Sequence, residues 1–491
     1  MSSSLAEVAR VCIDVIKNGA GNTAAAVEDS FETARPAPSL VSTSLHNDVN
    51  QNLEASEQTP RRSSSTFAPV ALHTQIANDV RECVSWAAAA AAASAAAESS
   101  PTPPPPHTGD VLLTGAAGYL GVHLALALAE SLPCSCRVLC LVRSAAGTDA
   151  GAAERLFAAA AAYKVDLLSP GARIVPLCGD VTQPLLGLQQ DVYRSLSLRA
   201  IVHAASAVKF IEGSADEGYS LLRGANVLPM RHLLSLAATC AHARAGSFHF
   251  HYVSTASVPM RSGQLCHSAL QLETFLKESS RGADGYALSK FACETALCEA
   301  ADLGHLFGAC ATLCRPGLLT WSTRQGAANN DDWANRLLAT CLQFGCVPDV
   351  TEGGSHAKGW TAPIEHSPVD CFSTVLARRV LNHASLPLRF LPTPRSSGRE
   401  ALTLAAALGA LQDALGLRGV ATKVWAHAVA HADPALGLRF SPLAGALLGG
   451  DGSFLDSFIV DDSQGVDGSE EVQCWRLGLD TFLRSLAASQ P

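Results

Sequence analysis

Residues 111–121 read VLLTGAAGYLG, an apolar run that ends in a glycine-rich turn. The glycines are Gly115, Gly118 and Gly121. The run predicts a buried strand, and the alanine- and leucine-rich residues 122–131 predict a helix behind it. Glycines at a strand-to-helix turn let backbone amides approach a pyrophosphate at the positive end of the helix. Because another apolar run follows at 137–142, the stretch predicts a βαβ unit that binds a dinucleotide.

The alternation of strands and helices continues through residues 107–320. Further strands are expected at 173–177, 200–203, 248–254 and 311–315, and helices at 224–241 and 286–301. This pattern predicts an α/β fold, a Rossmann-type doubly wound parallel sheet of the kind that binds dinucleotides. After it the alternation loosens, so we expect residues 321–491 to form a smaller, mostly helical subdomain that caps the substrate.

Two segments precede the expected sheet. Residues 1–66 are rich in Ser, Asn and Thr, which is typical of a poorly ordered region. Residues 67–106 combine a stretch of high helical propensity at 76–97 with the proline run 101–106. Proline cannot continue a helix, so we expect a helix followed by an extended linker.

Composition and charge exclude several classes of protein. The net charge is −9 without a lysine- or arginine-rich block, which argues against nucleic-acid binding. No apolar run of about 18 residues predicts an integral membrane segment, and the N-terminus lacks the layout of a signal peptide, so a cytoplasmic location is expected. The 16 cysteines lack paired CxxC spacing, so we expect buried thiols in a reducing compartment and no metal site.

Three strand ends are expected to contact the cofactor. Arg143 follows the second strand, where NAD enzymes keep an acid for the ribose; its guanidinium suits a 2′-phosphate and favours NADPH, unless it is a solvated surface residue. Asp180 and Val181 follow the third strand and suit the adenine ring, unless Asp180 is a turn residue. The fourth strand ends in His203, Ala204 and Ala205. The small residues there let the cofactor pass close to the backbone, and the histidine is alternatively a packed core residue.

A candidate catalytic pair begins the helix expected at 286–301. Tyr286 and Lys290 are four residues apart, so the phenol and the ammonium share one face of the helix. A free phenol has a pKa of about 10, so it needs a nearby cation to act near neutral pH. Thr255, at the end of the fifth strand, can share a substrate oxygen with Tyr286. Ser254 or Ser257 in that role, and a purely structural hydroxyl, stay open.

Together these residues resemble the extended short-chain dehydrogenases. More narrowly, residues 108–385 resemble the thioester reductase domains of nonribosomal peptide synthetases, polyketide synthases, carboxylic acid reductases and aminoadipate reductases. The narrower resemblance rests on the blocks 324–338 and 341–349, and on a strand-to-helix step from His366 to Asp370. Shared superfamily motifs include Asn226-Val, Tyr252-Val-Ser-Thr255 and Arg315-Pro-Gly317.

The resemblance implies an NADPH-dependent oxidoreductase that reduces an acyl thioester to an aldehyde or on to the alcohol. The acyl group would arrive on the phosphopantetheine of a carrier domain or on CoA. Thr255, Tyr286 and Lys290 would be catalytic, with the first two hydrogen-bonding the developing oxyanion. The implied cofactor-binding residues are Thr114, Gly115, Gly118, Tyr119, Leu120, Gly121, Arg143, Asp180, Val181, His203, Ala204, Ala205, Lys290, Arg315 and Pro316.

Other readings of the same residues stay open. A fatty acyl-CoA reductase shares the glycine turn and the Tyr/Lys pair, although the block 329–333 argues against it. Epimerases and dehydratases of nucleotide sugars usually carry an acid in place of Arg143. A non-catalytic NADPH-binding scaffold would not need the intact Thr255, Tyr286 and Lys290.

The segment around Ser39 loosely resembles the phosphopantetheine site of a carrier protein. Ala37 and Pro38 stand where such sites usually have Gly and Asp. A working carrier, a degenerate carrier remnant and an unrelated tail are therefore all open for residues 1–66.

Overall fold

The computed structural model describes residues 69–97, 108–168, 173–208, 215–244, 247–258, 285–350, 364, 366–381, 389–391, 402–430, 479 and 481–482. The carrier-like segment around Ser39 and the linker 98–106 lie outside the described residues.

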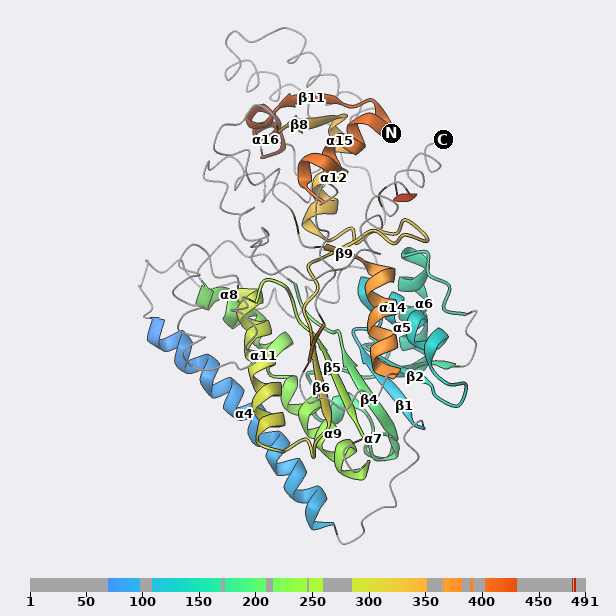
Figure 1. Cartoon of the computed structure of the whole chain (residues 1–491), viewed down its shortest axis with the longest axis vertical. Helices are drawn as coiled ribbons and strands as arrows, with labels where there is room; N and C mark the ends of the chain where they lie inside the picture. The colour runs from blue at the N-terminus through green and yellow to red at the C-terminus, as the bar shows by residue number, and fades with distance from the viewer. Residues whose placement is uncertain are drawn as a thin grey trace. The chain divides into compact units, whose positions relative to one another are not determined.

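Within the described residues, seven parallel strands form the main sheet (Figure 1). They are β1 (Asp110–Thr114), β2 (Val138–Val142), β3 (Ile174–Cys178), β4 (Leu198–His203), β5 (His249–Val253), β6 (Cys310–Cys314) and β10 (Arg389–Leu391). Their order is β3-β2-β1-β4-β5-β6-β10, so the direction of winding reverses between β1 and β4. The predicted Rossmann-type sheet is confirmed, and its ligand site is expected beyond the carboxyl ends of β1 and β4.

Helices cover both faces of this sheet. On one face lie α5 (Tyr119–Ser131), α6 (Asp149–Ala162) and α14 (Val369–Leu381); on the other lie α4 (Pro69–Ala96), α9 (Met230–Ala243) and α11 (Gly285–Asp302) (Figure 1). Successive side chains of β1 point to opposite faces of the sheet. Val111 and Leu113 pack against the layer of α5, α6 and α14, and Leu112 packs against the layer of α4, α9 and α11. Such two-sided burial explains why the parallel strands read as continuous apolar runs.

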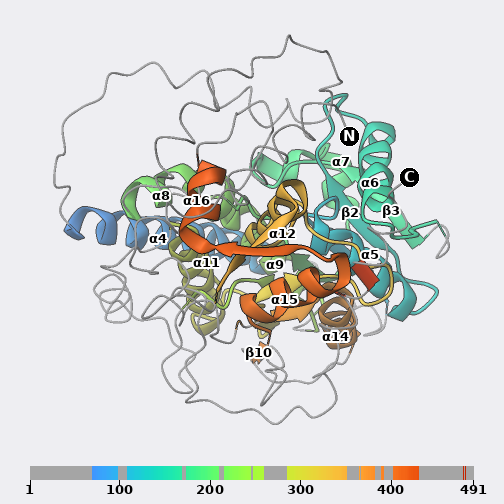
Figure 2. The same cartoon turned by 90° about the horizontal axis from the view of Figure 1, so that it is seen from above.

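The helix expected at 76–97 begins earlier, at Pro69, and is part of this body. Its apolar side chains recur every three or four residues and are buried in the core shared with α9 and α11; they are Leu72, Ile76, Val80, Cys83, Val84, Ala87 and Ala91. Figure 2 shows α4 in a second direction, again on the side of α11.

The single helix expected at 224–241 is wrong in its first part. Residues Arg223–Val227 form a π-helical turn, η3, and α9 begins only at Met230. The Leu228 amide donates to the Arg223 carbonyl over 3.1 Å, five residues back. Pro229 has no N–H to donate four residues back, which prevents a continuous α-helix here.

Shorter elements complete the sheet body. They are η2 (Pro184–Gly187), α7 (Gln190–Ser195), α8 (Ala215–Leu222), β7 (Leu318–Thr320) and β9 (His366–Pro368). β7 and β9 pair in parallel, and β9 leads directly into α14. The strand-to-helix step predicted between His366 and Asp370 is therefore confirmed.

A second compact unit holds part of the C-terminal region. It contains α12 (Trp333–Phe344), β8 (Cys346–Asp349), α15 (Leu404–Leu415), β11 (Arg418–Ala421) and α16 (Thr422–Ala430). β8 and β11 form a parallel pair in it. The contacts divide the chain differently from the boundary expected at residue 320, because α14 packs on α5 and β10 pairs with β6 in the sheet body.

No helix among the described residues is both long enough and apolar enough to cross a lipid bilayer.

Candidate active site

The glycine turn joins the end of β1 to the start of α5 with no side chain larger than a methyl group. Gly115 has a φ of +72°, and a Cβ on it would lie 2.6 Å from the Ala205 amide nitrogen. A Cβ on Gly121 would collide with the Gly115 carbonyl oxygen, and Gly118 is the residue before the first turn of α5. The turn therefore brings backbone and the helix N-terminus into a space that side chains would fill, as a pyrophosphate requires.

A hydrogen-bonded tie joins the ends of β1 and β4. The Thr114 hydroxyl lies 2.7 Å from His203 Nδ1 and accepts from the Ala205 amide over 3.2 Å. Burial, assisted by the charge of Lys290, lowers the pKa of His203 to about 3, so its ring is neutral. His203 is thus packed in the core, as the alternative sequence reading had it, and it supports the site through Thr114.

Lys290 lies under the strand end that carries Thr255. The Lys290 side chain is 2% exposed, and its ammonium donates to the Val253 carbonyl over 2.8 Å. Nζ also lies 5.0 Å from the Tyr252 ring centroid and 5.7 Å from that of Tyr286. The structure therefore brings the Lys290 ammonium and the ring of Tyr286 together at the carboxyl end of β5.

Burial lowers the pKa of Lys290 to about 8, while Cys293 and Glu294 oppose the shift. Few lysines have a pKa so close to neutral, and groups with such shifted pKa values often lie at functional sites.

Two of the three hydroxyls expected at the end of β5, those of Thr255 and Ser254, differ in burial and in hydrogen bonding. Thr255 is half-buried, and its hydroxyl donates to Ser257 Oγ over 3.3 Å and accepts from the Ser257 amide over 3.2 Å. The Ser254 hydroxyl is buried and has no hydrogen-bond partner among the described residues. Thr255 and Ser257 form a small hydroxyl pair beside the strand end.

Asn226 lies at the centre of a hydrogen-bond network. From the sequence we identify it as part of a shared motif and predict no role for it. Its carboxamide accepts from the Ala207 amide (2.7 Å) and donates to the Ala207 carbonyl (3.0 Å) and to Ser289 Oγ (3.1 Å). Ser289 in turn donates to the Tyr286 carbonyl over 2.7 Å. Asn226 thereby links the loop after β4 to the first turn of α11. Pro229, three residues on, was the sequence signal that the backbone departs from a regular helix here.

The expected 2′-phosphate residue has a second arginine beside it. Arg143 is exposed at the end of β2, and its carbonyl accepts from Arg155 on α6 over 3.1 Å. From the sequence we predict no helix over residues 149–162, and Arg155 is therefore not among the predicted cofactor residues. An exposed arginine on the helix after the second strand was the signal available.

Two of the predicted cofactor residues use their side chains elsewhere. The Tyr119 hydroxyl lies within hydrogen-bond distance of the Thr320 carbonyl (2.8 Å) and of the Ala327 carbonyl (2.9 Å), so its single proton is directed between them. Arg315 is buried in a two-point ion pair with Glu294 of α11. Its guanidinium connects the end of β6 to α11. The hydrogen bonds of Arg315 therefore give no support to its predicted contact with the cofactor.

Asp180 forms a turn after β3. Its Oδ1 accepts from both the amide and the hydroxyl of Thr182, each over 2.9 Å. This is the geometry of the turn residue that the sequence left open. Three other predicted residues act through packing or backbone: Leu120 and Val181 are partly buried against the two cores, and the Pro316 carbonyl accepts from the Ala256 amide.

The block 329–333 leads into α12, which begins at Trp333. Asp332 accepts from the Ala334 amide over 2.9 Å and caps the helix. Burial raises the pKa of Asp332 to about 6. Asp332 therefore has a structural function as the cap of α12.

Comparison with known proteins identifies the family. The model of an NAD-binding family, "Male sterility protein", matches residues 113–376. The isonitrile lipopeptide synthase of Streptomyces coeruleorubidus is 32% identical over 288 residues, 57% of this chain and 18% of that protein. The large subunit of L-2-aminoadipate reductase from Penicillium chrysogenum is 32% identical over 263 residues, 49% of this chain and 17% of that protein. The chain therefore matches about a fifth of the length of these relatives.

Solved structures agree with the fold. The terminal R domain of the myxalamid PKS-NRPS pathway superposes with a TM-score of 0.55 and 27% identity, covering 77% of this chain and 91% of that one. The reductase domain of a nonribosomal peptide synthetase from Mycobacterium tuberculosis gives 0.55 at 24% identity, with 78% and 93% covered, and shows the fold alone. The resemblance to terminal reductase domains is confirmed by these matches. Because the family model covers more than half of its residues, the chain belongs to the NAD-binding family "Male sterility protein", within the extended short-chain dehydrogenases.

Proposed function

We propose that this chain is an NADPH-dependent reductase that converts an acyl thioester on a phosphopantetheine carrier into an aldehyde. The observation that carries the proposal is the Tyr286–Lys290 pair, held at the carboxyl end of β5 by the bond from Lys290 to Val253. The glycine turn supports it, since its backbone fits a dinucleotide. The names of the relatives support it too, because they describe an aminoadipate reductase and reductase domains of peptide synthetases.

The residues divide the chemistry between binding and proton transfer. When bound, NADPH supplies the hydride. Thr255 and Tyr286 donate hydrogen bonds to the thioester oxygen as it gains negative charge, and Tyr286 gives up its proton to that oxygen. The resulting hemithioacetal breaks its C–S bond, releasing the aldehyde and the carrier thiol. The balance is one thioester, one NADPH and one proton in, with one aldehyde, one thiol and one NADP⁺ out.

Lys290 makes the phenol a usable acid. Its buried ammonium lies 5.7 Å from the Tyr286 ring centroid, and a cation at that range stabilises the phenolate that forms as the proton leaves. The residues expected to hold the cofactor are the glycines of the turn, Lys290 and the arginine pair Arg143 and Arg155.

The test mixes the purified full chain and NADPH with a phosphopantetheine-linked acyl thioester and, in parallel, with the matching acyl-CoA. NADPH absorbance and trapping of the aldehyde report turnover. Tyr286→Phe should lower kcat by about 10²- to 10⁴-fold, the usual contribution of a positioned acid. NADPH binding, followed by fluorescence, should stay within about twofold, because the ring is kept.

Unchanged turnover in Tyr286→Phe would refute the assigned role. Faster reaction of the CoA ester than of the carrier-linked ester would turn the proposal into an acyl-CoA reductase. Absence of NADPH oxidation with either donor would overturn the proposed reaction.

A further inference from the structure

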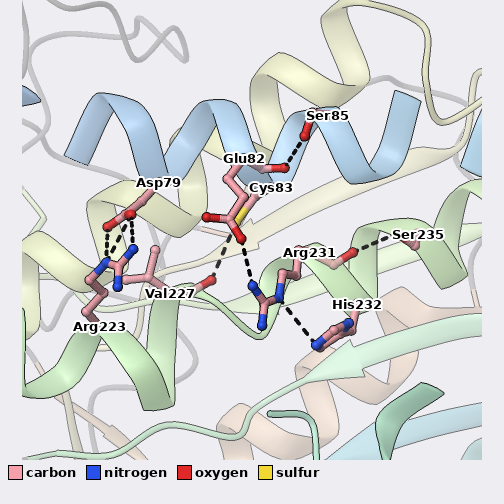
Figure 3. Close-up of polar contacts among 9 residues, drawn as sticks. All are labelled: Asp79, Glu82, Cys83, Ser85, Arg223, Val227, Arg231, His232 and Ser235. Carbon is pink, nitrogen blue, oxygen red and sulfur yellow. Dashed lines mark hydrogen bonds and ion pairs between the residues drawn. The ribbon is translucent and has the colours of Figure 1, made fainter. Parts of the chain in front are cut away.

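Helix α4 holds the π-helical turn η3 through an ion pair whose carboxylate is buried. Asp79 is 2% exposed, and its carboxylate accepts from Arg223 Nε over 3.0 and 2.8 Å and from the terminal guanidinium nitrogen over 2.7 Å. The Tyr219 hydroxyl donates to the same carboxylate over 2.9 Å. Figure 3 shows Asp79 of α4 facing Arg223, the first residue of η3. The two-point geometry fixes the orientation of the Arg223 guanidinium in addition to pairing its charge.

Two thiols bind the other end of the turn. The Cys83 thiol of α4 donates to the Val227 carbonyl over 3.6 Å, and the Cys293 thiol of α11 donates to the Asn226 carbonyl over 3.3 Å (Figure 3 shows the first). In a continuous α-helix the Arg231 amide would bond Val227, but here it donates to Leu228 over 3.3 Å. The thiols thus partner carbonyls at the end of the irregular turn. Burial raises the pKa of both thiols above the ordinary value, so they stay protonated and can donate.

The turn held in this way carries Asn226. Asn226 is 3% exposed, and its carboxamide joins Ala207 to Ser289, whose hydroxyl bonds the Tyr286 carbonyl. π-Helical turns inside helices occur frequently at functional sites. A shift of η3 would therefore move the anchor of the helical turn that presents Tyr286.

We propose that α4 is a working part of the active site, and that Asp79 is a positioning residue that sets Tyr286 through Arg223, η3 and Asn226. The proposal rests on the catalytic role given to Tyr286 above. It assigns to a helix outside the strand-helix alternation the task of keeping the catalytic turn in place. A two-point bond to a buried carboxylate suits this task, because replacing the carboxylate removes the bonds that hold Arg223 and so loosens the turn.

The same helix supplies a matched control. Glu82 pairs with Arg231 over 2.6 Å, also between α4 and the body, but Arg231 lies in the first turn of α9, beyond η3. The Glu82 carboxylate is 37% exposed, against 2% for Asp79, which makes its bond weaker. Glu82→Gln therefore disturbs the docking of α4 without removing a bond to the π-turn.

The experiment compares Asp79→Asn with Glu82→Gln in the full chain, each assayed well below its own melting temperature. We expect Asp79→Asn to lower kcat by about ten- to a hundredfold, the cost of a small displacement of a catalytic group. The dissociation constant for NADPH should stay within about twofold, since the glycine turn is untouched, and the pH profile of kcat should shift. Glu82→Gln should keep kcat within about twofold and keep the pH profile.

Cys83 provides a second pair of variants in case Asp79→Asn does not fold. Cys83→Ala removes the thiol bond to Val227 and should lower kcat, whereas Cys83→Ser keeps a donor and should restore most of it. Equal activity of these two variants, or wild-type kcat and pH profile in folded Asp79→Asn, would overturn the proposal. A loss in Glu82→Gln as large as that in Asp79→Asn would also overturn it, since general docking would then explain both.

Hydrogen exchange separates this proposal from the proposed function. Asp79→Asn should raise amide exchange at residues 223–228 and in the first turn of α11, and Glu82→Gln should not. If the wild-type chain reduces no thioester, the proposed function fails while the exchange still tests the link to Asn226. If the wild-type chain is active and the exchange at α11 is unchanged, the positioning by Asp79 fails alone.

Discussion

Lys290 is a buried cation that loses its charge at a pH slightly above neutral. Its ordinary pKa is about 10.5, and burial lowers the pKa to about 8. The ammonium is therefore present below about pH 8 and is neutral above it. Since the proposed chemistry needs this charge beside Tyr286, we expect kcat/KM to fall by about tenfold per pH unit as the pH rises above 8.

The pH profile of kcat/KM, measured with saturating NADPH, checks this expectation. Lys290→Arg keeps the charge at high pH and should flatten the alkaline limb, even though its level will be lower because the two side chains are not interchangeable. A wild-type profile that stays flat to about pH 9.5 would contradict the assignment.

The pair Arg143 and Arg155 bears on the choice between the two nicotinamide cofactors. Two guanidinium groups at the end of β2 would each contribute a charge-assisted bond to a 2′-phosphate, about 1.5–3 kcal/mol apiece. Arg143→Ala should therefore raise KM for NADPH about ten- to a hundredfold and leave KM for NADH nearly unchanged. Arg155→Ala should act in the same direction.

The exposed Arg81 of α4, which bonds Asn78, provides the control for charge removal. Arg81→Ala should leave the ratio of the two KM values as in the wild type. Equal use of NADH and NADPH by the unmodified chain would show that the arginines do not select the cofactor.

At the scale of elements, the glycine turn is the part least tolerant of change. A side chain at Gly121 would collide with backbone atoms of Gly115 and Ala116, which cannot move without opening the turn. Gly121→Ala should weaken NADPH binding by more than about a hundredfold, because the amides leave the position in which a pyrophosphate meets the helix N-terminus.

Gly409, in the interior of α15, is the matched control. A Cβ there meets no atom within 4 Å, so Gly409→Ala should keep NADPH binding and stabilise its helix by up to about 1 kcal/mol. Fluorescence titration with NADPH and urea unfolding measure the two effects. Binding by Gly121→Ala within about twofold of the wild type would contradict the role of the turn.

The helices differ in how far local sequence explains them. α5 and α11 follow from runs of residues with high helical propensity, such as alanine and leucine, and their predicted positions agree with the structure to within a few residues. η3 does not, because its backbone depends on donors from elsewhere in the chain, the carboxylate of Asp79 behind Arg223 and two thiols. The sequence signal for it, Pro229, marks a break but not the kind of turn that forms.

At the scale of the whole molecule, the chain comprises two compact units, and the candidate site lies in the sheet body. A ligand stabilises only the part that binds it, by about 2.7 kcal/mol when its concentration is a hundred times its dissociation constant. We therefore expect NADPH to raise the melting temperature of the sheet body and not that of the unit built on α12 and α15.

Scanning calorimetry with and without NADPH checks this, and Gly121→Ala serves as the control that should lose the shift. One transition that moves as a whole would show that the two units unfold together. No shift at any concentration of NADPH would contradict cofactor binding.

The sequence by itself determined the parts whose cause is local. The glycine turn, the order of strands and helices, and the spacing that puts Tyr286 and Lys290 on one helical face all depend on neighbours a few residues away. Only the tertiary structure decided which side chains meet. It places Arg155 beside Arg143, buries Arg315 against Glu294, and brings Asp79 of α4 into contact with Arg223 of η3. Asp79 and Arg223 are 144 residues apart, and no periodicity in either segment encodes their contact. It forms because the apolar stripe of α4 must be buried, and burial on the sheet body carries its carboxylate to the turn that supports the candidate site.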